Sequence, residues 1–153
     1  MKKLYLPVGL SLFLSMAGWP HAQNGDSEII GIWEFQTITS TYFSDPQEII
    51  SNDQGVNNRE TLTFRGDQSF SFRGIYDGIE NAGIGIWEIS ESKLIINVNG
   101  EKTIGNYDLN GALLTLNIDE EETDDYYASN SILKYKKRII SPKSYKKKKH
   151  SKK

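Results

Sequence analysis

Histidine and cysteine, the side chains that most often act as nucleophiles, general bases or metal ligands, are almost absent from this chain of 153 residues. The two histidines, His21 and His150, lie near the two ends of the sequence, and there is no cysteine. The central part of the chain therefore has neither a Ser-His-Asp or Cys-His nucleophile system nor a metal site built from imidazole or thiolate.

Carboxylates are the remaining candidates for acid–base chemistry, because a pair of them can hydrolyse a glycosidic bond. In the strand patterns described below, Glu34, Glu88 and Asp108 alternate onto the outward face. Only Glu60 shares the phase of the inward apolar residues. A single inward carboxylate does not make a catalytic pair, so we expect a protein that is not an enzyme.

The densest run of carboxylates, at 119–125, offers the oxygen ligands that calcium prefers. It lacks the glycine and the alternate spacing of an EF-hand loop, so a solvated acidic loop is the expected structure. We expect no metal and no cofactor.

The first 23 residues have the pattern of a secretory signal peptide. Lys2 and Lys3 precede an apolar run over 4–17, which is shorter than the roughly 20 apolar residues of a membrane-spanning helix. We expect export to the periplasm, the outer membrane or the extracellular space. Because there is no cysteine, the cleavage region cannot carry the lipid of a cysteine-anchored lipoprotein, and the mature protein has no disulfides.

Charge divides the rest of the chain into a domain over 24–138 and a basic tail over 139–153. Residues 24–133 hold all 20 acidic side chains and five basic ones, whereas the chain from Lys134 onward holds eleven basic residues and no acidic one. We expect the tail to be either a disordered, solubilising terminus or a segment that binds a polyanion, such as an anionic membrane surface or a glycan, and no nucleic acid. The candidate polyanion-binding residues are Lys146, Lys147, Lys148 and Lys149.

Between the two ends the chain has the pattern of eight short strands. The first expected strand covers 29–38, and a long polar connection over 39–59 follows. Antiparallel strands joined in chain order by tight turns favour an all-β, single up-and-down barrel, because closure removes exposed edges. A two-layer β-sandwich is the alternative. The other seven strands are expected at 60–65, 69–73, 83–90, 93–98, 102–109, 112–118 and 129–137.

A Gly-Ile-Trp-Glu sequence occurs twice, at 31–34 and at 85–88, and each copy is followed by a further apolar residue. Side chains two positions apart lie on one face of a strand, so Trp33 and Trp87 are expected to point inward while the glutamates point outward. Two indoles that face inward from separate strands indicate a sheet that closes around a core.

The Gly31-Ile32-Trp33 sequence, the long first connection and the seven further strands resemble the lipocalins, in particular the lipocalin-like domains of exported bacterial proteins. Lipocalins carry Gly-x-Trp on the first strand, and a basic residue from the end of the last strand lies across the indole. Lys136, Lys137 or Arg138 would supply that residue here. The resemblance implies an eight-stranded calycin-type barrel with a cup-like lumen, in a family whose members mostly bind small apolar molecules.

The resemblance therefore implies a small hydrophobic ligand in the lumen, which would enter beside the 39–59 connection. The alternative is a solid barrel in which the two tryptophans fill the core. The protein would then be an envelope-associated interaction module that its basic tail holds to anionic surfaces. The candidate lumen residues, chosen by strand phase, are Trp33, Phe35, Leu62, Phe64, Phe72, Trp87, Ile89, Tyr107 and Tyr135.

Overall fold

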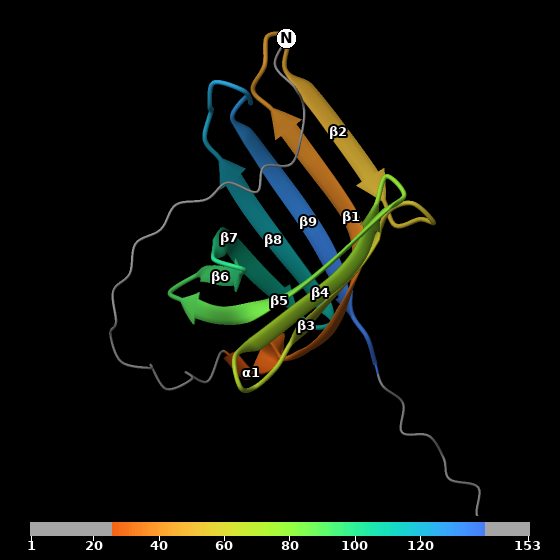
Figure 1. Cartoon of the computed structure of the whole chain (residues 1–153), viewed down its shortest axis with the longest axis vertical. Coiled ribbons are helices and arrows are strands. Elements are labelled where there is room, and N and C mark those ends of the chain that lie inside the picture. Colours follow the sequence, from red (N-terminus) through yellow and green to blue (C-terminus); the bar gives the residue numbers. More distant parts are fainter. Residues whose placement is uncertain (1–25, 140–153) are drawn as a thin grey trace, which may run out of the picture.

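A computed structural model describes residues 26–139, which form an almost entirely β structure (Figure 1). The expected signal peptide over 1–23 and the lysine-rich end of the tail lie outside these residues. One short helix, α1 (Asp26–Ile29), precedes nine strands. These are β1 (Gly31–Tyr42), β2 (Glu48–Asp53), β3 (Arg59–Phe64), β4 (Ser69–Tyr76), β5 (Ile79–Ser90), β6 (Lys93–Val98), β7 (Glu101–Asn110), β8 (Leu113–Glu120) and β9 (Ser129–Lys137).

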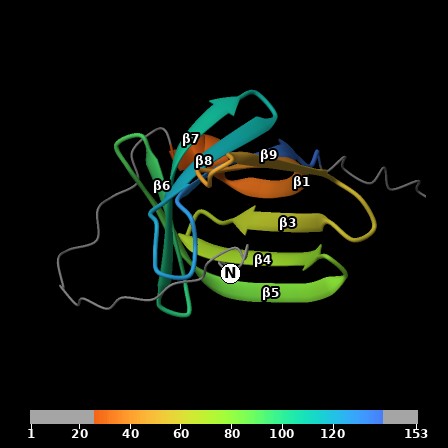
Figure 2. The same ribbon diagram turned by 90° about the horizontal axis from the view of Figure 1, so that it is seen from above.

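Eight of the strands close into an antiparallel up-and-down barrel. The order β1-β3-β4-β5-β6-β7-β8-β9 follows the chain, and β9 pairs with β1 to complete the ring (Figure 2). The closing pairing is long, because it runs from Trp33 opposite Lys137 to Tyr42 opposite Ser129. The predicted barrel is therefore confirmed, and the β-sandwich alternative is wrong.

The prediction of a long polar connection over 39–59 is wrong in part. β1 continues to Tyr42, and its second half pairs with the additional strand β2. The first half of β1 pairs with β3 instead, from Gly31 opposite Phe64 to Glu34 opposite Thr61. Polar residues in the β2 sequence suggested a loop. The neighbouring β1 is long enough to supply backbone hydrogen-bond partners, and these outweigh the weak intrinsic strand preference of the β2 residues.

The predicted turns are correct in some hairpins and displaced in others. Asn99 and Gly100 connect β6 to β7 with φ angles of 55° and 90°, as a two-residue hairpin turn requires. The strand expected at 83–90 begins earlier than predicted, because β5 starts at Ile79 and its first residues already pair with β4. A single turn at Asp77-Gly78 is enough to reverse the chain there.

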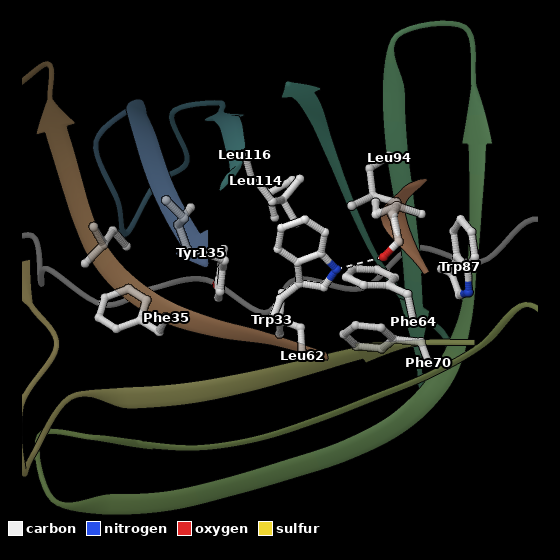
Figure 3. Close-up of a cluster of buried hydrophobic side chains, with 13 residues drawn as sticks. Trp33, Phe35, Leu62, Phe64, Phe70, Trp87, Leu94, Leu114, Leu116 and Tyr135 are labelled. Carbon is white, nitrogen blue, oxygen red and sulfur yellow. Dashed lines mark hydrogen bonds between the residues drawn. The ribbon is translucent and has the colours of Figure 1, made fainter. Parts of the chain in front are cut away.

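Inward side chains from most strands form one hydrophobic core (Figure 3). In the β3–β4 hairpin, Leu62 lies opposite Phe72 and Phe64 lies opposite Phe70, which confirms the shared face that alternation predicted. Trp87 packs edge-on against Phe64, with 5.5 Å between ring centroids. Its indole Nε1 donates a 2.9 Å hydrogen bond to the carbonyl oxygen of Arg65, so the one polar atom of the ring is satisfied.

One end of the barrel, which we call the closed end, is covered by α1 and Trp33. Trp33 is fully buried, and its Nε1 donates a 2.7 Å hydrogen bond to the carbonyl oxygen of Ile29. Lys137 Nζ lies 5.1 Å from the centroid of the Trp33 ring and donates to the carbonyl oxygen of Glu28 at 2.7 Å. A Cβ at Gly31 would lie 2.7 Å from Lys137 Cε, and its φ is +146°, so this crossing depends on glycine.

Candidate functional site

Three polar side chains meet inside the barrel beside the aromatic core. Glu60 comes from β3, Tyr76 from β4 and Tyr135 from β9. The Tyr135 hydroxyl donates a 2.7 Å hydrogen bond to Glu60 Oε1, and the Tyr76 hydroxyl lies close enough to this carboxyl group to affect its pKa. We call these three residues the carboxyl–phenol cluster. Glu60 is the strand carboxylate that the alternation placed inward, and its position confirms that prediction.

The backbone of the neighbouring strand makes room for the Glu60 side chain. Gly74 of β4 lies directly opposite Glu60 in the register. A Cβ at Gly74 would lie 3.2 Å from the Glu60 Cβ and 2.9 Å from the carbonyl oxygen of Arg59. A side chain at this position would therefore displace Glu60, so glycine at 74 is part of what holds the cluster together.

Burial dominates the electrostatics of the cluster. Loss of solvent raises the pKa of Glu60 above its usual value, and the hydrogen bonds to Tyr135 and Tyr76 oppose that rise. Burial also raises the pKa of Tyr135 and of Tyr76, and the negative charge of Glu60 raises both further. The two phenols therefore remain protonated hydrogen-bond donors throughout the physiological pH range, while the carboxyl group is the acceptor that they share.

Aromatic side chains surround the cluster. Phe35 of β1 meets the rings of Tyr76 and Tyr135 edge-on, with centroid distances of 6.4 and 5.9 Å. Trp33 and Leu62 fill the interior from Phe35 toward the closed end (Figure 3). The carboxyl–phenol cluster thus lies where the solid aromatic core gives way to a more polar interior.

The structure brings all nine predicted lumen residues together in or against one core. Six of them are buried, with at most 5% of the side chain exposed: Trp33, Phe35, Leu62, Phe64, Trp87 and Tyr135. The other three are only partly buried and pack against that core: Phe72, Ile89 and Tyr107. The buried group extends from the closed end to the carboxyl–phenol cluster, and the partly buried residues are the ones that retain accessible surface.

A second polar group lines the inner wall on β1, β8 and β9. The hydroxyl groups of Ser40 and Ser131 lie 2.8 Å apart. Ser129 donates a 3.1 Å hydrogen bond to Glu120 Oε2, and burial raises the pKa of this half-buried carboxyl group. The expectation that Glu120 belongs to a solvated loop is wrong, because β8 extends to it. Leu114, Leu116 and Ile118 alternate inward along β8, and the same alternation continued by two residues would have predicted that Glu120 points inward as well.

Within residues 26–139, the cluster can exchange hydrogen bonds and protons with a polar group. The same part of the chain has no group of three or more histidine, cysteine, aspartate or glutamate side chains placed to hold a metal ion. Nor does it contain a helix with the length and apolar character needed to cross a membrane. The predicted polyanion-binding residues Lys146, Lys147, Lys148 and Lys149 lie outside the described residues.

Comparisons with known proteins add no further assignment. Neither a family model, nor a curated protein, nor a solved structure matches the chain significantly.

Proposed function

We propose that this protein is an exported, non-enzymatic, lipocalin-like binding protein that holds a small hydrophobic molecule in its barrel. The closed eight-stranded antiparallel barrel is consistent with a calycin-like fold. Lys137 lies across Trp33, which is the arrangement that the lipocalin resemblance implies. The closed end is filled by the aromatic core, so the ligand enters from the opposite end, where β1 leads into β2.

The observation that carries this proposal is the carboxyl–phenol cluster among apolar inward side chains. Burying a carboxyl group is unfavourable, and an apolar residue at position 60 would stabilise the barrel at least as well. Core stability therefore does not explain Glu60. Ligand sites, in contrast, are mostly apolar with a few polar groups that orient the ligand. The partly buried Phe72 and Tyr107 supply apolar surface from other strands of the same interior.

The cluster also favours one kind of polar group on the ligand. The Tyr135 hydroxyl already donates to Glu60 and the Tyr76 hydroxyl lies near the same group, so the carboxyl oxygens are the acceptors available to a ligand. An alcohol can donate a hydrogen bond to them. A ligand carboxylate would place a second negative charge beside Glu60 at low dielectric, which is strongly unfavourable. We therefore expect a long apolar alcohol to bind in preference to the corresponding acid.

Titration of the mature protein with two matched ligand pairs tests this function. The pairs are retinol with retinoic acid, and hexadecanol with hexadecanoic acid, followed by tryptophan emission. We expect each alcohol to bind at micromolar concentration and each acid about tenfold more weakly, a difference of about 1.4 kcal/mol. In Glu60→Gln the alcohol should still bind, and the preference over the acid should disappear.

Glu88→Gln is the matched control, because Glu88 is an exposed residue on the outward face of β5 and should leave the preference unchanged. Failure of all four compounds and of haem to bind would refute a carrier function. It would support the solid-barrel alternative, an interaction module held to anionic surfaces by the basic tail.

A further inference from the structure

A hollow of about 500 Å³ lies where the sheet divides on the outside of the barrel. β1 pairs with β3 up to Glu34 and then changes partner to β2. The pairing of β1 with β2 extends one residue beyond β2, because the backbone N–H of Gln54 donates to the Gln36 carbonyl oxygen at 2.7 Å. β3 instead stays with β4, so β2 and the β3–β4 pair diverge (Figure 1).

Two arginines project into this hollow from adjacent strands. Arg59 of β3 and Arg73 of β4 both line it, and both are exposed. Arg59 lies opposite Ile75, two residues from Arg73, so the two arginines are diagonal neighbours on one face of the hairpin. Diagonal neighbours in an antiparallel pair are about 7–8 Å apart at the backbone, and two long side chains at that spacing can reach one ligand group.

The charges around the hollow leave these two guanidinium groups available. Arg138 forms an ion pair with Glu34, with 2.6 Å between Nη2 and Oε1. Glu60 reaches the hollow from the inner side, but its carboxyl group is already bonded to Tyr135. Among the described residues, neither Arg59 nor Arg73 makes an ion pair or a side-chain hydrogen bond. Two arginines with no ion-pair partner among the described residues therefore share a concave site, whose lining also includes the carboxylates of Glu34, Glu60 and Glu80.

We propose that this hollow binds a small anionic molecule that carries hydroxyl groups, of the sugar phosphate or sugar acid class. Paired guanidinium groups match the geometry of a phosphate or carboxylate group and hold it by charge-assisted hydrogen bonds. The volume suits a whole small molecule rather than a bare ion. Thr61, Gln54 and Glu80 on the walls of the hollow supply oxygen and amide groups that can bind hydroxyl groups.

Glu60 and Gly74 border both this hollow and the interior site, but Arg59 and Arg73 have the opposite strand phase and face outward. The occupant of the hollow is polar, whereas the barrel interior is lined mainly by apolar side chains. Loss of one site therefore leaves the other testable, and retinol binding should be unchanged by substitutions at Arg59 or Arg73.

Calorimetric titration of the mature protein at low salt tests the site with four probes: glucose 6-phosphate, glucuronate, glucose and inorganic phosphate. We expect glucose 6-phosphate and glucuronate to bind, inorganic phosphate to bind about tenfold more weakly than glucose 6-phosphate, and glucose not to bind. Arg59→Gln and Arg73→Gln should each weaken glucose 6-phosphate binding about tenfold or more. Added sodium chloride should weaken it further.

Arg65→Gln provides the matched control. Arg65 donates from Nη2 to the Ser71 hydroxyl at 3.2 Å, and it does not line the hollow. Its substitution should change the affinity by less than about twofold. Equal losses in Arg65→Gln and Arg73→Gln, equal binding of glucose, or no binding of any probe at about 10 mM would overturn the proposal. Inorganic phosphate that binds as tightly as glucose 6-phosphate would overturn the assignment of a hydroxylated ligand.

Discussion

The closed end of the barrel and the carboxyl–phenol cluster satisfy their buried polar atoms in different ways. At the closed end the indole nitrogens of Trp33 and Trp87 donate to backbone carbonyl oxygens. In the cluster, side chains bond to one another, and one of them is a carboxyl group. The stability of the first region therefore depends on apolar volume, whereas that of the second depends on protonation.

This difference indicates that stability alone explains the closed end but not the carboxyl–phenol cluster. An interior that only needed to be stable would resemble the closed end throughout, because apolar packing requires no charge to be buried. The cluster introduces a group whose burial is unfavourable, held in place by glycine at 74 and by two phenols. Substitutions that remove apolar volume at the closed end and the titratable group in the cluster should separate the contributions of packing and of protonation to stability.

The largest effect is expected at the closed end. Trp33→Ala removes a fully buried indole that contacts both α1 and the core, so it should lower the free energy of unfolding by about 3–5 kcal/mol. Urea denaturation followed by the emission of Trp87 measures this loss. Leu113→Ala, which truncates a residue that is 37% exposed on β8, is the control and should cost less than about 1 kcal/mol. Similar losses in the two variants would show that Trp33 does not hold the closed end together.

A smaller and pH-dependent effect is expected at the cluster. Because burial raises the pKa of Glu60 in the folded protein above its ordinary value of 4.5, the folded state keeps this proton to a higher pH than the unfolded chain does. The resulting stability is fully present below pH 4.5 and is lost as pH rises through the folded pKa, with a slope of up to about 1.4 kcal/mol per pH unit.

Comparison of Glu60→Gln with the parent protein across that range isolates the Glu60 contribution, since glutamine keeps the shape of the side chain and cannot titrate. The difference in unfolding free energy between the two proteins should shift in favour of the variant as pH rises. Tyr76 and Tyr135, the titratable groups that face Glu60 from β4 and β9, stay protonated over the same range. A difference that stays constant from pH 4 to pH 8 would contradict the raised pKa.

The smallest effect is expected from the cation that covers Trp33. Lys137→Met keeps most of the apolar stem across the indole but removes the charge and the bond to the Glu28 carbonyl oxygen. The loss should be about 0.5–1 kcal/mol in thermal or urea denaturation. Lys136→Met, on the exposed side of β9, should have no measurable effect. If the two lysine variants behave alike, the contact over the Trp33 ring contributes nothing to stability.

Local patterns predicted much of this structure correctly. The last strand was expected at 129–137, and β9 covers those residues. The alternation in the β3–β4 hairpin placed Leu62 and Phe64 inward, and it also placed Glu60 there. These predictions succeeded because strand phase depends only on neighbouring residues, and the burial of one face is strong enough to select it. Prediction failed where a distant strand decided the outcome, as it did for β2 and for Glu120.

The sequence by itself therefore determined the strand phases, the succession of antiparallel hairpins and the inward direction of the two tryptophans. Only the tertiary structure decided which side chains meet. Tyr135 reaches Glu60 across 75 positions, and Lys137 reaches the helix preceding Trp33 across 109 positions, because β9 closes the ring against β1. The division between β2 and β3, and with it the hollow that holds Arg59 and Arg73, likewise arises from the change of partner along β1. Such contacts depend on the register of strands far apart in the chain, which short-range alternation does not encode.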